Sequence, residues 1–90
     1  MIHLELLFFA QIREVTGVRT TGAVLPDGSR LIDLIEHLTA VYGKNFGEKI
    51  ESIDGLRILI NGREYYLLGG MEALLAENDT VIFLPPIAGG

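Results

Sequence analysis

The chain contains no cysteine, only seven Lys and Arg residues, and no long apolar run. Without cysteine it has no disulfide, thiolate nucleophile or zinc ribbon, so any sulfur chemistry must use a group other than a protein thiol. Twelve Asp and Glu residues bring the formal net charge to −5. This charge argues against nucleic acid as a partner, because phosphate contacts need clustered basic residues. A small acidic domain is better suited to docking on a basic protein surface.

No segment approaches the roughly 18–20 consecutive apolar residues that span a bilayer, and the start, Met1 to Glu5, lacks the basic region of a secretory signal. We therefore expect no membrane partner and a cytoplasmic location. A chain of 90 residues, 49% of them hydrophobic and 21% charged, suits one folded domain. His3 and His37 are far apart in the sequence, with no Asp, Glu or Cys at ligand spacing that would complete a metal site, so we expect no metal site.

The first half of the chain predicts a β-hairpin followed by a helix. Alternating apolar residues indicate a strand over residues 2–9, and a second strand is expected over 19–25, with a short helical turn at 10–15 between them. Ser29 is a good N-cap for a helix that ends before Gly43. The residues expected to face inward from this helix are Leu31, Leu34, Ile35, Leu38, Val41 and Tyr42.

The second half predicts a loop and three more strands. Residues 44–55 are polar and mixed, so a loop with at most one helical turn is expected there. Asn61-Gly62 is a strong hairpin signal. It joins expected strands at 56–60 and 63–67. A 3₁₀ or single helical turn is expected at 71–75, followed by a last strand at 80–84 that Pro85-Pro86 ends.

This order of elements predicts an α+β, ubiquitin-like β-grasp fold. The expected sheet is mixed, has about five strands, and carries one main helix on one face. The first and last strands are expected to be parallel neighbours in its middle. Residues 1–84 would form the domain, and residues 85–90 a projecting tail.

The tail ends in Gly89-Gly90, and this ending is the most informative feature of the sequence. Two terminal glycines arise by chance in about 0.5% of chains at average glycine usage. A stiff Pro-Pro base and a slender end suit insertion into a narrow enzyme channel, because glycine lets the backbone approach another group closely. The Gly90 carboxylate is then the reactive group. The alternative is an ordinary frayed terminus.

Four segments together resemble a known family. They are Leu7-Phe8-Phe9-Ala10-Gln11-Ile12-Arg13-Glu14, Asn61-Gly62, Glu77-Asn78-Asp79-Thr80-Val81, and Phe83-Leu84-Pro85-Pro86-Ile87-Ala88-Gly89-Gly90. The chain is similar over essentially its whole length to ubiquitin-like sulfur carriers of the MoaD/ThiS type. It looks most like the small subunit of molybdopterin synthase.

The resemblance implies a two-stage reaction at the C-terminus. A ubiquitin-activating-type adenylyltransferase uses MgATP to adenylate the Gly90 carboxylate, and a persulfide donor then supplies sulfur to leave a thiocarboxylate. The tail that carries the thiocarboxylate then inserts into the large subunit of molybdopterin synthase and donates sulfur for the molybdenum cofactor. The carrier would itself be non-catalytic and hold no cofactor, with ATP used by its partner enzyme.

Strand alternation predicts where partners dock. Side chains that point away from the helix would form an apolar patch on the opposite face, beside the tail; the alternative is that loops cover them. The resemblance places Phe9 and Leu84 against the large subunit, whereas Glu64 stands where some members carry an apolar residue. The expected partner-binding residues are Leu7, Phe9, Leu59, Ile82, Leu84, Pro85, Pro86, Ile87 and Ala88.

Three other functions remain open from the sequence. The chain could be a protein modifier that forms isopeptide bonds through Gly90. It could carry sulfur for another pathway, such as that of thiamine. It could also be an interaction module in which Gly-Gly is incidental.

Overall fold

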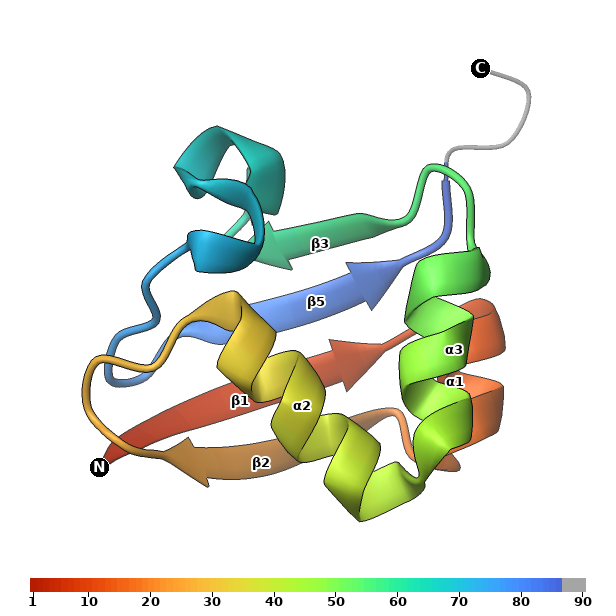
Figure 1. The fold of residues 1–90 in the computed structure, drawn as a ribbon, viewed down its shortest axis with the longest axis horizontal. Coiled ribbons are helices and arrows are strands. Elements are labelled where there is room, and N and C mark those ends of the chain that lie inside the picture. Colours follow the sequence, from red (N-terminus) through yellow and green to blue (C-terminus); the bar gives the residue numbers. More distant parts are fainter. Residues whose placement is uncertain (87–90) are drawn as a thin grey trace.

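The computed structural model describes residues 1–86, which form one mixed sheet with helices on one face (Figure 1). The strand order is β2-β1-β5-β3-β4, and β1 and β5 are parallel neighbours in the centre, as predicted. The other neighbouring strands are antiparallel. The strands are β1 (Ile2–Phe8), β2 (Thr20–Leu25), β3 (Arg57–Ile60), β4 (Arg63–Glu64) and β5 (Thr80–Leu84).

One helix, α2 (Leu31–Tyr42), crosses one face of the sheet, and two others lie together at the end of the sheet where β1 and β5 finish (Figure 1). These two are α3 (Lys44–Ser52), which packs against α2, and α1 (Ala10–Thr16), which packs against α3. Two short 3₁₀ turns, η1 (Tyr65–Leu68) and η2 (Gly70–Glu72), connect β4 to the segment before β5. The prediction of a ubiquitin-like β-grasp fold is confirmed.

The core lies between the sheet and these helices. Every second residue of β1 is buried, as the alternation predicts, and the same holds for β3 and β5. Phe8 and Phe83 stack with ring centroids 5.5 Å apart, and Phe46 of α3 packs against both. Burial of one such side chain contributes about 1.5–3 kcal/mol. This aromatic cluster therefore fixes α3 to the central strands.

The expectation of a loop at 44–55 is wrong, because α3 occupies most of that segment. Phe46 and Ile50 are both buried. They lie four residues apart, so they share one side of the helix. The remaining residues of α3 are mostly polar and face outward. A narrow apolar stripe in a polar stretch is enough to hold a helix when a packed surface lies beneath it.

Two details of α2 also differ from prediction. Arg30 precedes the helix as its N-cap residue, and its N–H donates to the Asp33 carboxylate at 2.7 Å. Ser29 instead donates its hydroxyl to Pro26 O at 2.7 Å, closing the preceding turn. Val41 is 59% exposed, because α3 begins two residues after α2 ends and covers a different side of it. The other five predicted inward residues are buried or packed against the core.

The second hairpin forms at Asn61-Gly62, both with positive φ, as predicted. Asn61 also donates to Asp79 Oδ1 at 2.7 Å and accepts from Thr80 N–H at 2.9 Å. The returning strand is shorter than expected and stops at Glu64. Tyr65 and Leu68 then pack against the core at a three-residue spacing, which suits the turn η1 better than a strand.

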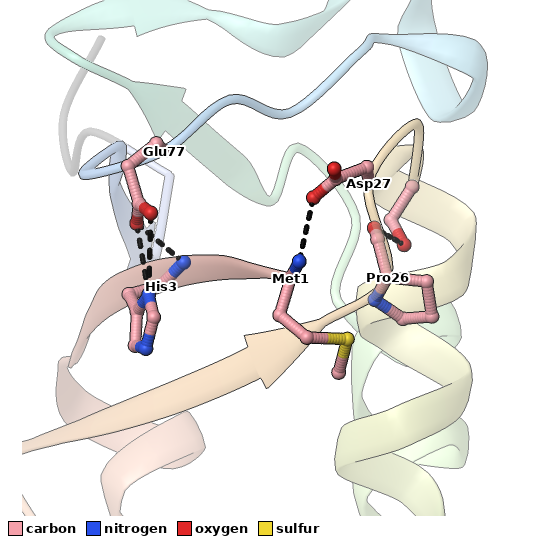
Figure 2. Close-up of polar contacts among 6 residues, drawn as sticks. Met1, His3, Pro26, Asp27 and Glu77 are labelled. Carbon is pink, nitrogen blue, oxygen red and sulfur yellow. Dashed lines mark hydrogen bonds and ion pairs between the residues drawn. The ribbon is translucent and has the colours of Figure 1, made fainter.

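Polar contacts hold the start of β1 (Figure 2). The His3 N–H donates to Glu77 Oε1 at 2.7 Å, and the His3 ring nitrogen Nδ1 lies 3.1 Å from the same oxygen. The backbone hydrogen bond from His3 lowers the pKa of the Glu77 carboxyl. The Met1 amino group lies 2.8 Å from Asp27. These contacts tie β1 to the segment that leads into β5 and to the turn after β2.

Candidate partner-docking face and C-terminal exit

Three apolar side chains form a row across the sheet on the face away from α2 and α3. The strand register places Leu7 of β1 beside Ile82 of β5, and Ile82 beside Leu59 of β3. Phe9 and Leu84 continue the apolar surface toward the end of β5, where Phe9 N–H donates to Phe83 O at 3.2 Å. All five side chains of this surface are half-buried. We call these five residues the sheet-face patch: Leu7, Phe9, Leu59, Ile82 and Leu84.

The alternation of the strands thus places the sheet-face patch where the sequence predicts it. The alternative, that loops bury these side chains, does not hold for the described residues, since none of the five belongs to the buried core. Their predicted role in partner binding stays a prediction.

An ion pair borders the sheet-face patch on the β3–β4 side. Arg57 Nε lies 2.7 Å from Glu64 Oε1, and both side chains are mostly buried. Leu84 lies opposite Arg57 in the register, and Leu59 lies opposite Glu64. The second carboxylate oxygen of Glu64 is buried with no hydrogen-bond partner among residues 1–86. Glu64 therefore adds a polar border where an apolar residue would have widened the patch.

An arginine borders the sheet-face patch on the opposite side. The Arg13 guanidinium lies 5.7 Å from the centroid of the Phe9 ring, and its Nε donates to Phe8 O at 3.2 Å. A cation over an aromatic face contributes about 0.5–1 kcal/mol at an exposed site. A shallow hollow beside this pair is lined by Leu7 and Arg19 among others. Arg13 thus holds the Phe9 ring in place at the end of the patch.

The chain leaves the sheet at the end of β5, next to the patch. Pro85 is half-buried and Pro86 is exposed, and a Cβ added at Gly55 would lie 3.2 Å from Pro86 Cβ. Gly55 has φ +76°, which a larger residue adopts only with strain. The turn between α3 and β3 therefore supports the base of the tail. No sequence pattern at Gly55 or Pro86 predicts that these two residues lie close together.

Ile87, Ala88, Gly89 and Gly90 lie outside the described residues. The predicted roles of these four residues, and the predicted division into a domain and a tail, stay predictions. Within residues 1–86, no group of three or more His, Cys, Asp or Glu side chains is placed to hold a metal ion. In that same part of the chain, no helix combines the length and apolar character needed to cross a membrane.

Sequence reasoning missed three features of this region: the Arg57–Glu64 pair, the Arg13–Phe9 contact and the support of Pro86 by Gly55. The two-residue turn at Asn61-Gly62 does set Leu59 opposite Glu64, so the polar border could have been found from the hairpin. The other two contacts depend on how the ends of α1 and α3 meet the sheet.

Comparison with known proteins shows which family has this architecture. The model of the ThiS family matches residues 6–90. This chain belongs to the ThiS family. The resemblance to MoaD/ThiS-type carriers that the motifs indicate is thereby confirmed.

Individual relatives of this ThiS-family protein carry two kinds of name. Small archaeal modifier protein 3 of Haloferax volcanii is 38% identical, covering 99% of this chain and 100% of the relative. The molybdopterin synthase sulfur carrier subunit of Chlamydomonas reinhardtii is 29% identical, with the same coverage. The solution structure of small archaeal modifier protein 1 from Methanosarcina acetivorans has a TM-score of 0.80 at 31% identity, covering 100% of this chain and 98% of that one.

Proposed function

We propose that this protein is a sulfur carrier that serves as the small subunit of molybdopterin synthase, with the Gly90 carboxylate as its working group. The observation that carries the proposal is the position of β5. This central strand ends beside an apolar patch and leads directly into Pro85-Pro86. A partner that covers the patch would therefore receive the tail at the same time.

The chemistry begins with activation of a poor electrophile. A Gly90 carboxylate oxygen attacks the α-phosphorus of ATP on the partner enzyme and releases pyrophosphate, giving an acyl-adenylate. The terminal sulfur of a persulfide donor then attacks the acyl carbon, and AMP leaves. A thiol cleaves the resulting acyl disulfide and frees the thiocarboxylate. The chain supplies no cysteine, so the donor sulfur and the thiol both come from partners.

Docking would use the sheet-face patch with the tail threaded into the partner. Apolar residues at an interface centre carry most of the binding energy, and polar residues at the rim set orientation. Arg13 and the Arg57–Glu64 pair lie at the two borders of the patch and would form such a rim. No general base is required from the carrier, since the reacting carbon is held in the partner's site.

The intact mass of the protein tests the sulfur-carrier proposal. We expect incubation with its cognate activating enzyme, MgATP and a persulfide donor to raise the mass by the difference between sulfur and oxygen. Adding the large synthase subunit and the pterin substrate should return the mass to its starting value. The proposal would be contradicted if the mass of this protein stayed unchanged under conditions in which the same enzyme converts a second carrier to its thiocarboxylate.

A second candidate function is protein modification, in which the activated Gly90 acylates lysine amines of other proteins. The observation that favours it is the higher identity to a relative named as a modifier, 38% against 29% for a sulfur carrier subunit. Both functions share the adenylation step. Conjugates of higher mass in cell extract that disappear when Gly90 is deleted would support the modifier function.

A charge placed in the sheet-face patch tests the docking surface. Leu84→Glu puts a carboxylate opposite Arg57, so the fold should tolerate it. We expect this variant to raise the Kd for the activating enzyme by about 30-fold, the effect of losing roughly 2 kcal/mol at an interface centre. Val41→Glu is the matched control, because Val41 is 59% exposed on α2. Equal binding by both variants would show that the sheet-face patch is not the docking surface.

A further inference from the structure

One edge of the sheet is a regular strand with no charge in it. β2 is the outermost strand on its side, and Figure 1 shows no strand beyond it. Its sequence, Thr-Thr-Gly-Ala-Val-Leu, has neither a charged residue nor a proline. Exposed edge strands pair readily with other chains, so proteins usually protect them with charges, prolines, bulges or short length. The opposite edge follows that rule, since β4 is two residues long and both residues are charged.

The hydrogen-bond pattern identifies which backbone groups of β2 are unused. Phe8 N–H donates to Arg19 O at 2.9 Å, so these two residues form a hydrogen-bonded pair. Such pairs recur at every second residue of an antiparallel ladder. The N–H and C=O groups of Thr20, Gly22 and Val24 therefore point away from β1, along the outer edge.

Gly22, at the middle of this edge, is not required by the packing within the chain. An added Cβ would meet only Leu4 O, at 3.7 Å, which is ordinary contact. A glycine weakens a strand and often marks a place where another backbone approaches. Val24, next along the edge, is 46% exposed.

We propose that β2 is a self-pairing edge through which two copies of this chain join their sheets, antiparallel about a two-fold axis at Gly22. This register sets Thr20 of one copy opposite Val24 of the other and Gly22 opposite itself. Every outward N–H and C=O group of the three residues is then paired. If the two-fold axis moved by one residue in either direction, either Thr20 or Val24 would face a residue other than Thr20, Gly22 and Val24 of the second copy. The edge is thus complementary to itself in one register only.

The charges at the two ends of β2 favour the same antiparallel arrangement. Arg19 precedes the strand, and Asp27 follows it, held by the Met1 amino group at 2.8 Å. Antiparallel pairing brings Arg19 of one copy toward the end of β2 in the other, where Asp27 is already paired with the Met1 amino group, whereas parallel pairing would bring the two Arg19 guanidinium groups together. The net charge of −5 on each copy opposes association, so the pairing is expected to be weak and to strengthen with salt.

Pairing in this register would place both sheet-face patches on the same side of one continuous sheet. Thr20 lies beside Leu7 in the register, so β2 adjoins the patch without covering it. A partner with two docking sites could then bind both carriers at once, which raises the apparent affinity. The pairing does not depend on the chemistry proposed for Gly90.

Analytical ultracentrifugation of the full chain, up to about 1 mM protein at low and high salt, tests the proposal. We expect a monomer–dimer equilibrium that shifts toward dimer with concentration and salt. Val24→Lys should remove the dimer by placing an ammonium group on the edge. Val41→Lys makes the same change in charge on the exposed face of α2 and should leave the dimer intact.

A second variant tests whether the pairing runs through Gly22. Gly22→Pro removes an N–H that points outward and so leaves the β1–β2 ladder intact, and it should also give a monomer. In the wild type, amide hydrogen exchange at Thr20, Gly22 and Val24 should slow by at least about tenfold between dilute and concentrated samples. A wild type that stays monomeric, or a dimer that survives both edge variants, would overturn the proposal. A dimer that is lost when Gly90 is deleted would also overturn the proposal, because the contact between copies would then involve the tail.

Discussion

Replacing Phe46 by alanine tests how firmly α3 holds the strand that leads to the tail. The side chain is fully buried, and its ring centroid lies 6.0–6.2 Å from those of Phe8, Tyr42 and Phe83. Truncating a buried phenylalanine costs about 3–5 kcal/mol in transfer and cavity terms. A domain of this size has roughly 5–13 kcal/mol of stability. The Phe46→Ala variant should therefore lose a large share of the free energy of unfolding.

The expected loss corresponds to a fall in Tm of about 12–40 °C for a domain of 60–100 residues. Urea denaturation followed by circular dichroism measures the free energy directly, and the slope should stay near that of the wild type. Val41→Ala on α2 is the control, with an expected change within about 0.5 kcal/mol. A loss below about 1 kcal/mol for Phe46→Ala would refute the reasoning, because it would mean that α3 is not packed on the sheet.

Two further predictions concern the polar contacts that join distant segments. Asn61→Ala should destabilise the protein by about 1–3 kcal/mol in the same denaturation assay, because it leaves polar groups of Asp79 and Thr80 without their partners. Its positive φ adds strain for alanine. Glu77→Gln should lower stability at neutral pH. The difference from wild type should shrink as pH falls through the lowered pKa of Glu77, because that contribution is complete only above the pKa of the unfolded chain. A pH-independent difference would contradict this second prediction.

Local patterns in the sequence predict most of the sheet. Alternation along residues 2–8 identifies Phe8 as a core residue, and Asn61-Gly62 fixes the second hairpin and its register. The parity of the strands then assigns Leu7 and Ile82 to the opposite face. These predictions succeed because a one-residue shift would turn every side chain to the wrong face.

The helical layer is less predictable, since it depends on contacts between distant segments. Phe46 and Ile50 are two apolar residues in a polar stretch, and only the surface formed by β1, β5 and α2 makes them the buried side of a helix. The same packing leaves Val41 exposed, although its spacing fits the inner stripe of α2. The contact of Gly55 with Pro86 likewise arises only once α3 has set the position of the turn.

The central claim is that the terminal carboxylate is activated by a partner's nucleotide chemistry. ATP–pyrophosphate exchange catalysed by the cognate activating enzyme measures that step alone, before any sulfur donor takes part. We predict exchange that depends on the full-length chain and is lost when Gly90 is deleted, with the Tm of the deleted chain unchanged. Equal exchange with and without Gly90 would contradict the account.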